Sequence, residues 1–174
     1  MKKIILPFFL VGTLIMIVVM VMTGAPLKTE AAPNGILNLE FAYDSSSVNK
    51  IIHSWAGLKD VDGIAAAERN TMFDFIFLFF YSFFLFFYSG YLSKTFGGQF
   101  GKAGKWIGRG ALLAGGLDIL ENTGMLISLS GKVSNVVAMF TVCCSVVKWL
   151  LALAAVLYVF TGTISLLRTR IMNR

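Results

Sequence analysis

Charged side chains are scarce in this sequence of 174 residues, where Asp, Glu, Lys and Arg make up 14% against 57% hydrophobic residues. Soluble domains typically carry about 25% charged residues, so the composition excludes an ordinary soluble protein. Histidine occurs once, and the two cysteines, Cys143 and Cys144, are adjacent. A structural disulfide between neighbours would be badly strained, and a Cys/His zinc site lacks ligands. We therefore expect an integral membrane protein with no metal and no cofactor.

Four apolar stretches are long enough to cross a bilayer as helices, which takes about 20 residues each. They comprise residues 4–23, 72–92, 107–130 and 133–167. We predict an all-α fold, a transmembrane four-helix bundle that forms a single membrane domain. Residues 24–70 should form a small extracytoplasmic segment between the first and second spans.

Basic residues are grouped at three places that four spans would put on the same side of the membrane. These are Lys2 and Lys3, the loop 93–105 together with Arg109, and the stretch after the fourth span. None of these groups contains an acid, and the positive-inside rule makes such a side cytoplasmic. Both termini are then predicted to be cytoplasmic. The net charge of +6 is explained by this orientation signal, and no nucleic-acid partner is expected.

The first apolar stretch has two interpretations. Two lysines before a long apolar run are typical of a secretory signal, and Ala25 is a small residue near a possible cleavage point. The run is longer than the 7 to 15 residues usual for a signal core. We therefore expect an uncleaved membrane anchor.

Two patterns lie within residues 24–70. Residues 37–41 alternate between apolar and polar side chains, which predicts a short strand. After Ser45–Ser47, which can cap a helix, apolar residues recur at helical spacing, at Val48, Ile51, Ile52 and Trp55. We expect this amphipathic helix to close the outer end of the bundle, because its polar face lacks the cationic cluster of a membrane-surface helix.

The third span carries Asp118, Glu121 and Asn122, where a bilayer favours apolar side chains. A charge at the bilayer centre costs about 2.5–3.5 kcal/mol on insertion scales, so such groups face a bundle interior and are functional candidates. On a helix turning 100° per residue, Asp118 and Asn122 share one face and Glu121 lies at its margin. The sequence thus predicts a buried polar site.

Partners for these acids lie in the neighbouring spans. Lys148 is about 14 residues inside its span and Asp118 about 12, so at ~1.5 Å per residue their depths match and we predict a salt bridge. Glu121 then lacks a cation, and we expect it to line a cavity open to the outer leaflet. In the second span Asp74 and Tyr81 share an inward face, while the phenylalanines opposite should look at lipid.

Three functions fit this candidate site, which comprises Asp74, Tyr81, Asp118, Glu121, Asn122 and Lys148. The first is binding or carrying a small amphiphile or membrane lipid. The second is a scaffold or accessory subunit that contacts a protein partner or forms a homo-oligomer. The third is intramembrane acid/base catalysis by Glu121 or Asp118 beside Lys148, although no nucleophile motif identifies catalytic residues. A polar chain from Asp74 through Tyr81 to Glu121 favours binding or catalysis, whereas a sealed ion pair or a dry Glu121 favours the scaffold.

Three short stretches resemble a pattern found in small, uncharacterised bacterial four-span membrane proteins. They are Ala31-Ala32-Pro33-Asn34-Gly35-Ile36, Phe73-Asp74-Phe75 and Leu117-Asp118-Ile119-Leu120-Glu121-Asn122. The resemblance covers most of the chain. It implies a multi-pass protein of the bacterial cytoplasmic (inner) membrane and brings no activity with it.

Overall fold

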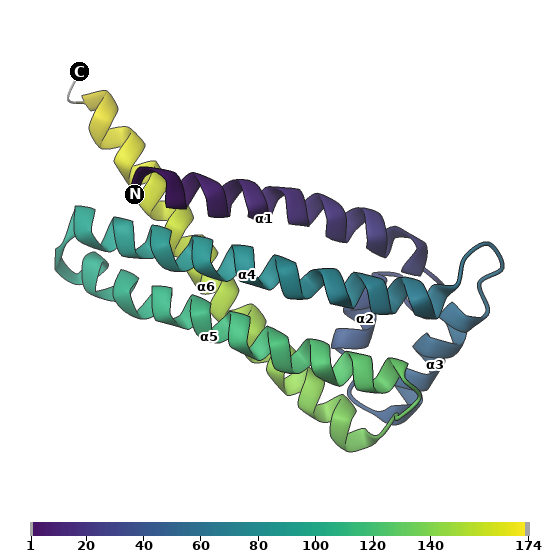
Figure 1. Cartoon of the computed structure of the whole chain (residues 1–174). Coiled ribbons are helices and arrows are strands. Elements are labelled where there is room, and N and C mark those ends of the chain that lie inside the picture. The colour runs from purple at the N-terminus through teal and green to yellow at the C-terminus, as the bar shows by residue number, and fades with distance from the viewer. Residues whose placement is uncertain (1, 173–174) are drawn as a thin grey trace.

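Four long helices make up most of the computed structural model, which describes residues 2–172 (Figure 1). They are α1 (Lys2–Gly24), α4 (Gly63–Phe96), α5 (Gly98–Leu129) and α6 (Asn135–Met172). All four are long and apolar enough to cross a membrane. The predicted all-helical class and the four candidate spans are therefore confirmed.

The helices extend beyond the predicted spans. Asp62 caps α4, its carboxylate accepting a hydrogen bond from the Ala65 N–H at 3.0 Å, and the helix runs unbroken to Phe96. The predicted loop over residues 93–105 is wrong, because the chain reverses within Gly97 and Gly98, whose φ angles are 61° and 54°. Glycine adopts positive φ without strain, so two glycines suffice for the turn and α5 begins at once.

Helix α4 lies between α1 and α5, and α6 crosses α5 and α4 obliquely (Figure 1). On the α1 side, the ring of Phe9 stacks on that of Phe83 with centroids 5.5 Å apart. It also contacts Phe79 and Phe87, at 5.6 and 5.5 Å. The phenylalanine face of α4 is thus partly covered by α1, which corrects the prediction that it looks only at lipid. Aromatic pairs of this kind stabilise beyond their buried area, so α1 has a reason to dock there.

Three short helices connect α1 to α4, namely η1 (Ala25–Leu27), α2 (Ile36–Glu40) and α3 (Ser45–Ala56). The strand predicted at residues 37–41 is wrong, since this stretch is helical and residues 2–172 offer no strand with which it could pair. Asp44 caps α3 through a 2.7 Å hydrogen bond from the Ser47 N–H. The cap was expected from Ser45–Ser47, one position later than observed.

Helix α3 closes one end of the bundle, as its amphipathic pattern predicts. Its buried residues Val48, Ile51 and Trp55 pack in one apolar cluster with Met125 of α5 and Ala138 of α6. The cluster joins residues of the connecting segment to residues of α5 and α6. It therefore fixes the connecting segment against the long helices.

Helix α2 lies deeper than α3, beside the long helices (Figure 1). The backbone carbonyl of Glu40 accepts a hydrogen bond from the Ser145 hydroxyl at 3.1 Å. Ser145 lies ten residues inside the Asn135 end of α6, which corresponds to about 15 Å along the helix. Leu37 and Phe41 of the same stretch are exposed apolar residues. The segment predicted to lie wholly outside the spans thus reaches between them.

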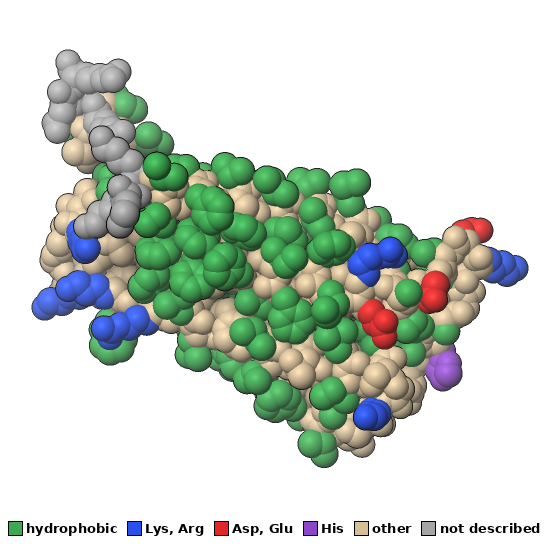
Figure 2. Space-filling view, in the orientation of Figure 1, with side chains coloured by type: hydrophobic (Ala, Val, Ile, Leu, Met, Phe, Trp, Pro, Cys, Tyr) green, Lys and Arg blue, Asp and Glu red, His purple; other side chains and the backbone are tan. Residues whose placement is uncertain are grey.

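Exposed charges gather at the two ends of the molecule on the face shown in Figure 2, and apolar side chains cover the length between them. Such a belt is what a bilayer requires of spanning helices. The structure therefore supports a multi-pass membrane protein.

Candidate polar centre

Three carboxylates surround the ammonium group of Lys148. The Lys148 Nζ lies 2.7 Å from an oxygen of Glu121, 3.1 Å from one of Asp118 and 3.5 Å from one of Glu40. Asp118 and Glu121 come from successive turns of α5, Lys148 from α6 and Glu40 from α2. The lysine therefore joins the last span to both the third span and the connecting segment.

Neutral side chains extend this cluster on both sides. The Tyr81 hydroxyl of α4 donates to the second oxygen of Asp118 at 2.8 Å. The indole N–H of Trp149 donates to Glu40 at 3.2 Å. The Asn122 amide donates to Asp74 at 2.9 Å. We call these eight residues the polar centre: Glu40, Asp74, Tyr81, Asp118, Glu121, Asn122, Lys148 and Trp149.

The polar centre is almost completely shielded from solvent. Glu121 and Asn122 have no exposed surface, and Asp118 retains 2%. Trp149, at 37% exposed, lies at its edge. Charges in such surroundings are costly unless paired, because a low dielectric strengthens attraction and repulsion alike.

Sequence reasoning placed six of these residues correctly in one neighbourhood. The predicted contact between Asp118 and Lys148 is present at 3.1 Å. The prediction that Glu121 stands apart from this pair is wrong, because its contact with Lys148 is the shortest of the three. Residues three apart on a helix differ by about 60° in direction, so one lysine can reach both acids.

Glu40 and Trp149 were missed. Glu40 is the one acid within the stretch 37–41, whose alternation predicted a short strand. The sequence signal that could have identified Glu40 is a carboxylate among the apolar residues Ile36, Leu39 and Phe41. The third span carries the same signal. Nothing in that pattern reveals that the chain turns back between the spans.

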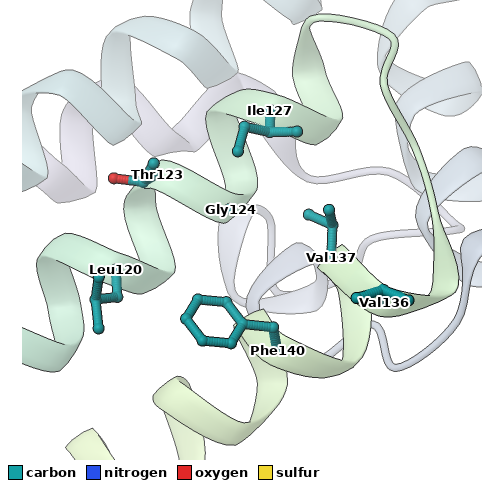
Figure 3. Close-up of a pocket in the computed structure, with 7 residues that line it drawn as sticks. All are labelled: Leu120, Thr123, Gly124, Ile127, Val136, Val137 and Phe140. Atoms are coloured by element: carbon teal, nitrogen blue, oxygen red, sulfur yellow. The ribbon is translucent and has the colours of Figure 1, made fainter.

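Glu121 has no exposed surface, which contradicts the predicted cavity beside it. A groove of about 220 Å³ lies between α5 and α6 and is lined by apolar groups, as Figure 3 shows. Its α5 residues, Leu120, Thr123, Gly124 and Ile127, flank Glu121 in sequence, but Glu121 does not line it. The expected outer-leaflet opening at Glu121 is therefore corrected to a buried contact with Lys148.

No family model, curated protein or solved structure matches this chain.

Acceptors outnumber donors in this centre. Three carboxyl groups share the single ammonium of Lys148, and a fourth, that of Asp74, accepts only from Asn122 among the described residues. Two further buried acceptors, the second oxygen of Glu121 and the amide oxygen of Asn122, have no hydrogen-bond partner in the structure. A buried acceptor without a donor costs about 1–3 kcal/mol. Because the unpartnered atoms are acceptors, the chemistry suits a donor such as a proton or an ammonium group.

Proposed function

We propose that this protein binds a small amphiphile in the membrane, with a positively charged, hydrogen-bond-donating head group held at the polar centre. The observation that carries the proposal is the surplus of buried acceptors at Glu121 and Asn122. A primary ammonium head group supplies one charge and three donors, which answers both the charge and the hydrogen-bond imbalance. A neutral hydroxyl head group would supply a donor without the charge, and an anionic head group would add to the surplus of negative charge.

Entry of a head group requires α2 to move, because the centre is closed in this structure. Glu40 makes the longest of the three contacts to Lys148, at 3.5 Å, and α2 has only five residues. Displacing Glu40 would also release the indole of Trp149, whose ring already lies 5.5 Å from the Lys148 ammonium. An aromatic face beside a carboxylate cluster attracts cations. In this proposal α2 is the gate and Trp149 the first contact.

The connected contacts of the polar centre favour a binding site over a simple ion pair that only fixes helix register. Tyr81 touches Asp118, Asp118 shares Lys148 with Glu121, and Glu40 joins the same lysine. An ion pair that fixes the register of two helices needs one acid and one base, whereas this network has several acids. Acid/base catalysis would use the same groups, but the sequence has no nucleophile motif, so binding remains the simpler proposal.

A structural role is the second candidate, and the complete burial of Glu121 against Lys148 favours it. Under this alternative the polar centre fixes the register of α5, α6 and α2, and the protein serves as a scaffold or accessory subunit of a membrane complex. Buried ion pairs can provide such specificity. The exposed apolar face of α1, which includes Val11, Leu14 and Val18, would then contact either lipid or a partner helix.

Binding of dodecylamine to the purified protein in nanodiscs distinguishes these functions. We expect saturable binding of one dodecylamine by native mass spectrometry, and weak binding of dodecanol, which has the same chain without the charge. Glu121→Gln should weaken amine binding about tenfold, equal to ~1.4 kcal/mol, while the exposed Glu68→Gln should not change it.

The thermal stability of Glu121→Gln in the absence of amine is the necessary control. A folded variant that binds dodecylamine as tightly as the native chain would contradict the proposal. Equal, non-saturable uptake of amine and alcohol would leave the scaffold as the better function.

A further inference from the structure

The groove between α5 and α6 has features of a binding site that are independent of the polar centre. Its lining residues Leu120, Ile127 and Phe140 are exposed on the outside of the bundle, at 45%, 38% and 49% (Figure 3). The groove therefore opens sideways, towards the medium that surrounds the helices. Both helices are candidate membrane spans, so that medium is lipid hydrocarbon.

Helices α5 and α6 approach closely beside the groove. A Cβ atom at Gly124 would collide with the Thr141 side chain, so the bare backbone lets the two helices pack together at this level. The larger side chains of Leu120 and Ile127, on either side of Gly124 in sequence, line the groove, whose volume is about 220 Å³.

Only hydrocarbon suits the interior of this groove. The one side-chain polar atom among its lining residues, the Thr123 hydroxyl, donates to the Ile119 carbonyl at 2.7 Å. No donor is left to hold a polar ligand. From Leu120 to Ile127 the groove follows α5 for about 10 Å, which is two-thirds of one leaflet of a ~30 Å hydrocarbon core.

A positive charge lies at the end of the groove where the two helices are joined. The backbone N–H of Lys132 donates to the backbone carbonyl of the lining residue Ile127 at 3.3 Å, which places this residue next to the groove. Lys132 is exposed. This is the charged residue of the turn 130–134. A membrane lipid with a phosphate head group would place its chain in the groove and its phosphate near this ammonium.

We propose that the α5–α6 groove is a specific site for one acyl chain of a phospholipid, with Lys132 holding the phosphate. By the predicted orientation the lipid belongs to the outer leaflet. The site does not depend on the proposed amine site, because Glu121 lies outside the groove.

The test uses the full chain in nanodiscs that contain a phosphatidylglycerol with a diazirine in its acyl chain. After irradiation, we expect labelling within residues 120–140, competed by unlabelled phosphatidylglycerol. Val137→Phe fills the groove and should reduce this labelling at least about tenfold. Val146→Phe, at an exposed position of α6 outside the groove, is the control and should leave the labelling unchanged.

Lys132→Gln tests the head-group half of the proposal. It should reduce labelling by the phospholipid but not by a diazirine fatty alcohol, and Lys50→Gln, exposed on α3, should change neither. Equal labelling of Val137→Phe and Val146→Phe would show ordinary boundary lipid and overturn the site. Equal loss of phospholipid and alcohol labelling in Lys132→Gln, or no loss of either, would overturn the role of Lys132. Crosslinking of these residues to another protein in native membranes, with no lipid adduct, would assign the groove to a partner helix instead.

Discussion

The carboxylate of Glu40 lies 3.5 Å from the ammonium group of Lys148, although the two residues are 108 positions apart. The contact joins the short helix α2 to the last membrane span at a depth where neither Asp118 nor Glu121 is exposed. It is the longest of the three contacts that Lys148 makes. The connecting segment is thus held by the same cation that holds the third span.

Replacement of Lys148 by Met should be among the most damaging single changes in this chain. It leaves three buried carboxylates without their shared cation, and removing one partner of a buried pair typically costs about 3–5 kcal/mol. The combined change with Glu40→Gln, Asp118→Asn and Glu121→Gln should recover much of the loss, because no unpaired charge remains. Thermal unfolding in one detergent would compare them, and additive losses would show that the residues do not act together.

Glu40→Gln should open the centre without unfolding the protein. Hydrogen bonds to charged groups contribute about 1.5–3 kcal/mol, so weakening this contact should raise the open population roughly tenfold or more. Cys144, which is buried, is a natural reporter once Cys143 is replaced by Ser. Its reaction with a small methanethiosulfonate reagent should accelerate accordingly.

The matched control for this experiment is Glu30→Gln, because Glu30 lies in the same connecting segment but is exposed. It should leave the rate of Cys144 modification unchanged. Similar rates in both variants would mean that Glu40 does not govern access.

The cap of α3 should make stability depend on pH below the neutral range. Hydrogen bonds from the Ser47 N–H hold the pKa of Asp44 below its usual value of 3.8. A lowered folded-state pKa means that the stabilisation is present above the unfolded value and is lost as pH falls through the folded one. Asp44→Ala should therefore destabilise α3 at pH 7 and make little difference once the pH is below the folded pKa. Melting temperatures of the native chain and of Asp44→Ala would be measured from pH 7 down to about pH 3. A difference between the two that does not change with pH would contradict a role of the Asp44 carboxylate.

The orientation derived from the basic clusters predicts which positions are reachable from outside. In a chain without its native cysteines, Ser46→Cys on α3 should react with an impermeant maleimide added to intact cells. Thr95→Cys, exposed at the turn end of α4, should react only after lysis. The opposite pattern would invert the membrane orientation and with it the leaflet assigned to the groove.

The contact between Asp118 and Lys148 could be predicted because helix geometry converts sequence position into depth and direction. Two inward-facing charges at one depth have few alternatives in a bundle. The same rules fail for Glu40, since the path of the connecting segment depends on tertiary contacts such as the hydrogen bond that the Ser145 hydroxyl donates to the Glu40 carbonyl. Five alternating residues also fit a strand or a helical turn equally well, so the alternation predicted a strand where the structure has α2.

Glu121 shows a different limit of sequence reasoning. Its face was identified correctly, but counting one acid per base left it without a partner and suggested a cavity. In the structure the longer glutamate side chain reaches the same ammonium as Asp118. How many groups share one charge depends on side-chain reach and packing, which sequence periodicity does not report.

The position of Lys148 in the last span has a consequence for how the chain is made. Synthesis proceeds from the N-terminus, so Glu40, Asp118 and Glu121 all leave the ribosome before the lysine that joins them. Until α6 enters the bilayer, α5 carries two acids without their cation, at a cost that favours delayed or reversible insertion. Helix α2, although made early, acquires its contacts with Ser145 and Lys148 only after α6 arrives, so it completes the assembly of the protein.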